Sequence, residues 1–464
     1  MMTLNLAVRN LLRNRRRSLA TLIAMSIGCA AILLFGGFSS NINYEMHTRI
    51  VQRGGHLQIQ HSDFYLYGSG NPTAYGISGY TKLLDAIKSD EVLRKIVLVA
   101  TPTLQFGGIA GNYSAGVSRT VVGNGFISED INRMRSWNDF GLSSEAPTSV
   151  LAGTAPDSAV VGIGVARVLQ LCEALKIASC AKPDVAKVND GKPIPDDIAL
   201  LSQQEAKTGP NALQASSGRI EVLVVNSRGA PNVTSLAVIR AEDQGVKELD
   251  EISLIMHLSK IQQLVYGKAD PKVTSIILQL SHSDQIPLAR ARLTPILANA
   301  SGQPLSVMDF RTLNPFYVQT VQMFDTIFGF VFVLIGAIVL FTVSNTMNTA
   351  VVERTVEIGT LRAIGVRRAG IRALFVTEGA LLGVCGALLG VVLAFAVSAI
   401  INRLGIPWVP PSTVEPVPLT ILVASEIRMI IGTTLGLICI AILSAWWPAY
   451  RAANLDVVEA LRHV

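Results

Sequence analysis

The segment Asn345–Arg372, NTMNTAVVERTVEIGTLRAIGVRRAGIR, lies between two long apolar runs, Ile327–Val343 and Ala373–Ile401. Its charged residues are Glu353, Arg354, Glu357, Arg362, Arg367, Arg368 and Arg372. A short charged segment between two apolar runs of membrane-spanning length is typical of a loop at a membrane face. Its arginines favour the cytoplasmic face, because positively charged loops are retained there.

The same segment has the apolar spacing of a helix. Its apolar residues near helical spacing are Val351, Ile358, Leu361 and Ile364. Gly359 and Gly365 each lower helix propensity by about 1 kcal/mol, so close packing against another element would explain them. The pattern predicts an amphipathic helix beside the membrane that suits docking onto a soluble protein. A solvated, positively charged loop is the alternative.

Two motifs here carry a family resemblance. ERTVEIGTLRAIG (353–365), followed by FVTEGALLGVCGALLG (375–390), resembles the signature of the MacB/FtsX-like ABC transporter permeases, which include the lipoprotein-releasing permeases. The resemblance extends to RNLLRNRRRSLATLIAMSIG (9–28) and PAYRAANLDVVEALR (448–462), whereas residues 110–240 match no motif. It implies that the segment is a coupling helix that meets an ATPase subunit. The residues expected to serve this coupling are Val351, Glu353, Arg354, Glu357, Ile358, Gly359, Leu361, Arg362 and Gly365.

The composition also indicates a membrane protein. The chain has 464 residues, of which 50% are hydrophobic and only 16% charged, too apolar for an ordinary soluble protein of this size. The formal net charge is +6, but the arginines cluster beside the apolar runs rather than among aromatic residues on a soluble face. This arrangement indicates membrane topology and excludes nucleic acid as the expected partner.

Four apolar stretches approach the roughly 20 residues that cross a bilayer as a helix. They predict an α+β membrane protein of four transmembrane helices, with a large extracytoplasmic α/β domain between the first two. The expected order is a basic lead and first helix (1–40), the extracytoplasmic domain (41–320), the second helix (321–346), a cytoplasmic coupling segment (347–372), the third helix (373–401), a short outer loop (402–427), the fourth helix (428–448) and a cytoplasmic tail (449–464).

The first apolar stretch, Leu19–Phe38, has two interpretations. Cys29 follows a sequence that resembles a lipoprotein cleavage site, so the stretch can be a cleaved signal peptide. Ser26 stands where such sites prefer a larger aliphatic residue, and the apolar run continues beyond Cys29, which favours a retained helix. The basic residues 1–18 before it form either an amphipathic interfacial helix that reaches lipid phosphates or a plain positive flank.

The outer block combines strand and helix patterns. Strands are expected at 57–59, 96–100, 219–226, 233–240 and 273–280, and helices at 81–94, 247–266 and 287–298. Matching α/β units on either side of a dissimilar middle predict one domain with another inserted at about 120–232. Within the insertion, the proline-rich segment Lys182–Asp197 is expected to be an exposed loop.

Cys172 and Cys180 lie eight residues apart in this block. In an oxidising compartment they can form a local disulfide, or they can be two unpaired thiols. The disulfide requires a bend, because a straight helix separates such positions by about 12 Å. No metal site is expected at His47, His56 or His61, because no set of ligands with metal spacing accompanies them.

The membrane runs contain glycines at spacings of three and four, which allow neighbouring helices to approach closely. They are Gly379, Gly383, Gly386, Gly390, Gly432 and Gly436. Glu378 is expected to pair with Arg372 at the helix end, since a buried carboxylate in lipid needs a partner. Pro448, after Trp446 and Trp447, is expected to end the fourth helix.

No phosphate-binding loop is found. Gly191-Lys192 and Gly267-Lys268 are followed by Pro193 and Ala269, not by Ser or Thr. The chain is therefore expected to be no enzyme and to hold no cofactor or metal, with ATP and Mg bound by a separate ATPase subunit.

The predicted function is an ABC transporter permease subunit that passes ATPase motion to the outer domain, which moves or extracts a lipoprotein, lipid, peptide or drug. A signalling subunit that activates a cell-wall hydrolase and a passive anchored receptor are the alternatives. Further expected partners are a second permease copy or paralogue, a periplasmic adaptor or lipoprotein, and membrane lipids. The expected location is the bacterial inner membrane.

Overall fold

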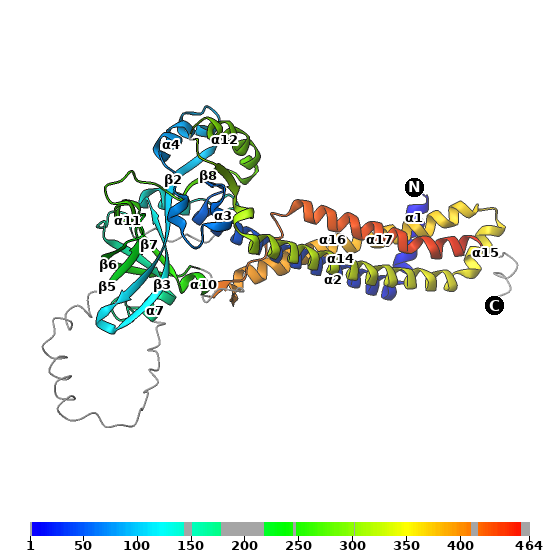
Figure 1. Ribbon diagram of the computed structural model, residues 1–464. Helices are drawn as coiled ribbons and strands as arrows, with labels where there is room; N and C mark the ends of the chain where they lie inside the picture. Colours follow the sequence, from blue (N-terminus) through cyan, green and yellow to red (C-terminus); the bar gives the residue numbers. More distant parts are fainter. Residues whose placement is uncertain are drawn as a thin grey trace, which may run out of the picture. The chain divides into compact units, whose positions relative to one another are not determined.

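The computed structural model describes residues 2–142, 151–177, 218–244, 247–300, 302–409 and 416–455. The chain divides into two compact units (Figure 1). The first, here called the membrane unit, contains Met1–Glu45, Phe316–Trp408 and Val417–Val464. The second, the sheet unit, contains Met46–Pro315 together with Val409–Pro416.

Four helices among the described residues are long and apolar enough to cross a membrane, as predicted. They are α2 (Arg15–Gly54), α14 (Pro315–Glu353), α16 (Arg368–Leu404) and α17 (Ile427–Ala453). Each extends beyond its apolar run into polar sequence. The short helices α1 (Met2–Arg13) and α15 (Thr355–Ala363) complete the unit, with the two-residue strands β10 (Pro407–Trp408) and β11 (Val417–Pro418) paired in the loop after α16.

Close approaches at glycine hold the long helices together. A Cβ built on Gly379 would lie 2.4 Å from the Cβ of Ala445, and one on Gly383 would lie 2.9 Å from the Cβ of Ala441, so both face α17. Real Cβ atoms do not come as close as 2.4 Å, so glycine is what permits this spacing of α16 and α17.

The other predicted glycines divide among three surroundings. Gly386 and Gly390 face α2, where added Cβ atoms would lie 2.8 Å and 2.4 Å from the Cβ atoms of Met25 and Cys29. Gly436 faces α14, with the Phe332 ring 2.8 Å away. A Cβ on Gly432 meets nothing within 4 Å among the described residues.

The expected helix end at Pro448 is wrong, because α17 continues to Ala453. A proline inside a helix removes one hydrogen bond and strains the preceding turn. Here Ala449, Ala452 and Ala453 are buried, and Arg362 Nη1 donates a 2.6 Å hydrogen bond to the carbonyl of Ala453. Burial of this last turn and the hydrogen bond to its end compensate for the bond lost at Pro448.

The described strands of the sheet unit form a nine-stranded sheet in the order β3-β7-β4-β6-β5-β2-β8-β1-β9. β3 also pairs with β2, so among the described strands β2, β3, β7, β4, β6 and β5 close into a ring. Their bounds are β1 Leu57–His61, β2 Val97–Asn112, β3 Val117–Phe126, β4 Ser158–Gly162, β5 Arg219–Val225, β6 Pro231–Glu242, β7 Ser253–His257, β8 Ser275–Leu280 and β9 Leu305–Asp309.

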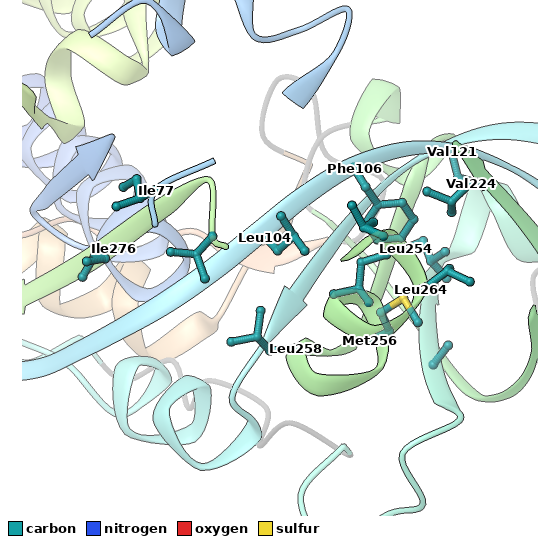
Figure 2. Packing of buried hydrophobic residues seen from close by; sticks show 14 of the residues in the cluster. Ile77, Leu104, Phe106, Val121, Val224, Leu254, Met256, Leu258, Leu264 and Ile276 are labelled. Atoms are coloured by element: carbon teal, nitrogen blue, oxygen red, sulfur yellow. The ribbon is translucent and has the colours of Figure 1, made fainter. Parts of the chain in front are cut away.

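The core of the ring contains inward-facing residues from several of its strands. Figure 2 shows Phe106, Val121, Val224, Leu254 and Met256 gathered in one cluster, and all five are buried. They come from β2, β3, β5 and β7, where buried and more exposed residues tend to alternate, as expected for strands with one face on a core. Burial of this face holds the register of the ring.

β2 also pairs with β8 outside the ring, and β2, β8, β1 and β9 lie side by side in that order, with every pair antiparallel. Helices α4 (Tyr80–Ser89) and α12 (Ile286–Ala300) contact each other, and α4 also contacts β2 whereas α12 contacts β9.

Most predicted elements of the outer block are confirmed, although the helix expected at 81–94 divides into α4 and α5. The other helices of the unit are α3 Phe64–Tyr67, α5 Leu93–Ile96, α6 Ser128–Arg135, α7 Ile163–Val168, α10 Lys247–Asp250, α11 Leu258–Tyr266 and α13 Phe310–Leu313, with 3-10 turns at Pro72–Tyr75, Tyr113–Ala115 and Ser283–Gln285.

The single helix expected at 247–266 is wrong, because the strand β7 separates α10 from α11. Leu254 and Met256 point into the core, and β7 pairs with β3 on one side and β4 on the other. Strand pairing on both sides outweighs the helical spacing that the longer segment shows.

Cys180 and the segment Lys182–Asp197 lie outside the described residues, so the disulfide with Cys172 and the exposed loop stay predictions.

Candidate coupling site

The charged segment forms a corner and a short helix at one end of the membrane unit. α14 ends at Glu353 and α15 begins at Thr355, with Arg354 between them at φ −107° and ψ 18°. The helical hydrogen bonds continue across this corner, because the amide of Arg354 donates to Ala350 and that of Ile358 donates to Arg354. The corner is therefore a bend in a nearly continuous helix, and its centre is a charged residue.

The Arg354 side chain points into the protein, where it joins three helices. Its Nη1 donates to Glu378 Oε1 on α16 at 3.0 Å, and its Nη2 donates to the carbonyl of Asn10 on α1 at 3.1 Å. Asn10 Nδ2 donates to the same Glu378 oxygen at 2.6 Å. The expected pairing of Glu378 with Arg372 is wrong, because the corner brings Arg354 to the carboxylate.

This ion pair is buried, with side-chain exposures of 6% for Arg354 and 2% for Glu378. Taking two charges out of water costs several kcal/mol each, so a buried pair adds little net stability, but removing one partner strands the other. Asn10 donates a hydrogen bond to Glu378, and its carbonyl accepts one from Arg354. These two hydrogen bonds offset part of the desolvation cost. A buried pair held by three helices fixes where the corner sits.

Exposed pairs tie the same corner to the N-terminal helices. Arg13 Nη2 at the end of α1 donates to Glu357 Oε1 at 2.7 Å. Arg17 in α2 donates twice to Glu353, at 2.9 Å and 2.6 Å, and Asn14 Nδ2 adds a 3.2 Å bond to the same carboxylate. Such surface pairs contribute about 0–1 kcal/mol each, so they orient α15 more than they stabilise it.

The other end of α15 closes with a glycine turn. Gly365 has φ +98°, a conformation that glycine adopts without strain. The amide of Gly365 donates to Arg362, and that of Val366 donates to Leu361, which is the hydrogen-bond pattern of a Schellman cap. This cap ends the helix and turns the chain toward α16.

The residues expected to couple to an ATPase divide by exposure. Val351, Arg354, Ile358 and Gly359 are buried inside the membrane unit. Leu361 and Arg362 are half-buried, and Arg362 is the residue that bonds Ala453. Only Glu353, Glu357 and Gly365 are exposed. Most of the motif therefore holds α15 in place rather than presenting a surface.

The structure exposes a different apolar set on this segment, here called the α15 patch. Its members and exposures are Val352 (69%), Val356 (43%), Ile364 (78%) and Val366 (37%). Val352 is in the last turn of α14 and Val356 is in the first turn of α15, on either side of the Arg354 corner. Exposed apolar residues of this size at the end of a helix bundle favour a protein contact.

No group of three or more potential metal ligands occurs among the described residues. The side chains at this site are cationic, anionic and apolar, and they provide ion pairing and packing rather than bond chemistry. The expectation that the chain holds no cofactor stays a prediction.

Residues 326–457, which include α15 and most of the helix bundle, match the family described as FtsX-like permease C-terminal. The Neisseria meningitidis lipoprotein-releasing system transmembrane protein LolC is 26% identical over 50% of this chain and 56% of its own length. The Bacillus subtilis ABC transporter permease YtrF is 34% identical over 29% of this chain and 30% of its own length.

A third relative is the macrolide export ATP-binding/permease protein MacB of Psychrobacter cryohalolentis, which is 28% identical over 46% of this chain and 30% of its own length. The matches thus span between 30% and 56% of the length of these three relatives.

Proposed function

Since the chain is an FtsX/MacB-like ABC transporter permease by its domain and its relatives, as its motifs predict, we propose that a separate ATPase subunit docks on the α15 patch and drives it. One observation carries this proposal. α15 is held to α1, α16 and α17 by its corner and by Arg362, while Val356 and Ile364 stay exposed. A helix fixed in this way passes a push on its exposed side to the long helices.

The long helices provide the route for that motion. α14 leads directly into the Arg354 corner and runs for 39 residues, or about 58 Å. α2 runs for 40 residues without a break and carries Arg17, which binds Glu353 next to the corner. Rigid helices transmit displacement with little loss, so we assign to α2 and α14 the transfer of motion to the sheet unit.

In this proposal the α15 end faces the cytoplasm and the sheet unit lies outside the membrane. Arginines on the α15 segment and on α1 support this orientation. α14 is the least buried of the four spans, at 17%, which leaves an apolar face for lipid or for a second permease copy. The names of LolC and MacB suggest a lipoprotein or a macrolide as cargo.

The test is loss of the ATPase on adding charge to the α15 patch. Both Val356→Glu and Ile364→Glu change exposed side chains, so we expect the protein to fold and insert normally. The chain is extracted from its host membrane in detergent, and an ABC ATPase subunit is identified among the retained proteins by mass spectrometry. We expect the double variant to retain at least about tenfold less of this subunit than the wild type, because burying two unpaired carboxylates in the interface is costly.

The matched control is Val233→Glu, which adds the same charge at a residue 50% exposed in the sheet unit. It should retain the ATPase at the wild-type level. Unchanged retention in the double α15 variant would show that the subunit docks elsewhere. Movement of a lipoprotein or a macrolide in reconstituted vesicles then tests the cargo.

A further inference from the structure

A cavity of about 470 Å³ lies among α1, α15 and the first turns of α16. Its volume falls in the range of about 300–1,000 Å³ typical of small-molecule sites. The apolar side chains that line it are Leu6, Ile358, Leu361, Ile371, Leu374 and Phe375. More than one wall of the cavity is therefore apolar, and exposing such a surface to water alone is unfavourable.

The polar lining of this cavity is mainly cationic. Arg9, Arg13 and Arg354 contribute to it, whereas its one carboxylate is Glu357. Two of the arginines are already neutralised, since Arg13 pairs with Glu357 and Arg354 pairs with Glu378.

Arg9 differs from these two arginines. No hydrogen bond or ion pair involves its side chain within the described ranges, and it is exposed. The cavity thus has one positive charge in excess. A ligand that complements it carries negative charge at one end and an apolar body at the other.

The position of the cavity narrows the choice of ligand. Ile371, Leu374 and Phe375 belong to the first two turns of α16, which is one of the candidate spans. On α1, Val8 and Leu12 are exposed apolar residues beside Arg9 and Arg13, as in helices that lie in a membrane interface. From this position we infer that the cavity is at the depth where the polar headgroups of a bilayer meet the acyl chains.

We propose that this cavity binds one anionic phospholipid, with the phosphate on Arg9 and the first part of an acyl chain along Ile371, Leu374 and Phe375. The inference does not depend on ATPase docking, because it concerns the inner side of α15 and not its exposed patch. A bound lipid would touch α1 and α15 together. Anionic lipid would then hold the N-terminal helix against the corner at Arg354 and Glu378.

The experiment reads the lipid directly. A photoreactive p-benzoylphenylalanine replaces Leu374 in the full chain, which is placed in nanodiscs of equal parts phosphatidylglycerol and phosphatidylcholine. Adducts are counted by mass spectrometry after illumination. We expect the phosphatidylglycerol adduct to exceed the phosphatidylcholine adduct about fivefold, the preference that one arginine near a membrane surface provides.

A reference position is Leu389, which lies farther along α16 and is 53% exposed. The same probe there should report the bulk ratio of the two lipids. A phosphatidylglycerol preference at Leu374 that does not exceed the one at Leu389 would overturn the proposal.

Two arginine variants separate the site from a general basic surface. Arg9→Ala removes the uncompensated charge, and Arg16→Ala removes another exposed arginine, which does not line the cavity. We expect the preference at Leu374 to fall to the bulk ratio in Arg9→Ala and to persist in Arg16→Ala. Equal losses in both variants would mean diffuse attraction and no site.

Filling the cavity provides an independent check. Thr360 lines it and is exposed, so Thr360→Trp should occupy the space without disturbing the fold and should lower both lipid adducts at Leu374. Millimolar inorganic phosphate should not compete with the phosphatidylglycerol adduct. Competition by phosphate would show that the site takes a free anion and would overturn the lipid assignment.

Discussion

Arg354 and Glu378 are 24 residues apart in the chain and form a buried ion pair, with Nη1 and Oε1 separated by 3.0 Å. The arginine is the corner between α14 and α15, and the glutamate is inside α16, so the pair fixes α15 to α16. The two residues come from two different family motifs, ERTVEIG and VTEGALLG. The motifs thus meet in space through opposite charges.

Removing one partner of this pair should destabilise the chain strongly. Glu378→Leu leaves the Arg354 charge buried without its anion, and such changes cost about 3–5 kcal/mol. The double variant Arg354→Met with Glu378→Leu should lose much less, because no charge is then stranded. Thermal unfolding in detergent compares the three proteins. Equal losses in the single and double variants would contradict the expected cost of a stranded Arg354 charge.

Arg372 provides the control for this comparison. It lies closer to Glu378 in the chain, but the carboxylate binds Arg354 and Asn10. Arg372→Met should therefore change the stability by no more than about 0.5 kcal/mol.

The exposed pairs beside the corner should be weak and sensitive to salt. Arg13 and Glu357 are about half exposed, so a double-mutant cycle of alanine variants should give about 0.2–1 kcal/mol. The Arg17 and Glu353 pair is less exposed and has two hydrogen bonds, so its coupling energy should be the larger. Both energies should shrink at about 1 M salt. The reverse ranking would show that the bidentate geometry does not persist in solution.

Replacing a glycine with alanine should lower the stability only where that glycine packs closely against a neighbouring helix. Gly379→Ala places a Cβ 2.4 Å from that of Ala445, and such overpacking costs about 1–3 kcal/mol. Gly432→Ala meets nothing within 4 Å among the described residues, and alanine favours a helix by about 1 kcal/mol. We therefore expect a lower melting temperature for Gly379→Ala and an equal or higher one for Gly432→Ala. Equal shifts would contradict the helix spacing described here.

The sheet unit should lose stability in acid through His56. This ring is buried, its Nδ1 accepts the Leu280 amide at 3.0 Å, and its Nε2 contacts Ser283 Oγ at 3.1 Å. Burial, with a smaller contribution from the nearby His47, lowers the pKa of His56 to about 3. The unfolded chain takes up this proton near pH 6.5, whereas the folded chain does not.

The direction in which stability changes with pH follows from this difference in proton uptake. The stability is complete above about pH 6.5 and decreases as the pH falls toward 3, by up to roughly 5 kcal/mol for the full shift. Exchange of the Leu280 amide, corrected for its intrinsic rate, should report the loss between pH 7 and 4. His56→Gln should flatten this dependence, and an unchanged slope in that variant would assign the effect to other groups.

Length and local pattern predicted a large part of the fold. The length of an apolar run such as Ala373–Ile401 can be compared directly with the thickness of a bilayer. This comparison requires no knowledge of the elements that pack against the run. Alternation predicted strands such as β1 and β5 for the same reason, because the faces of a strand are set by local geometry. The charged segment was also predicted as a helix between two spans.

Partners and faces required the tertiary structure. The amphipathic pattern of α15 includes two apolar sets, and only the packing of α1, α16 and α17 buries Ile358 and leaves Val356 outside. Sequence distance favoured Arg372 for Glu378, but the corner brings Arg354 to it across 24 residues. β7 is a strand because β3 and β4 flank it. Local periodicity determined the membrane spans and most of the helices, whereas long-range contacts, which no short stretch encodes, decided which side chains meet and made β7 a strand.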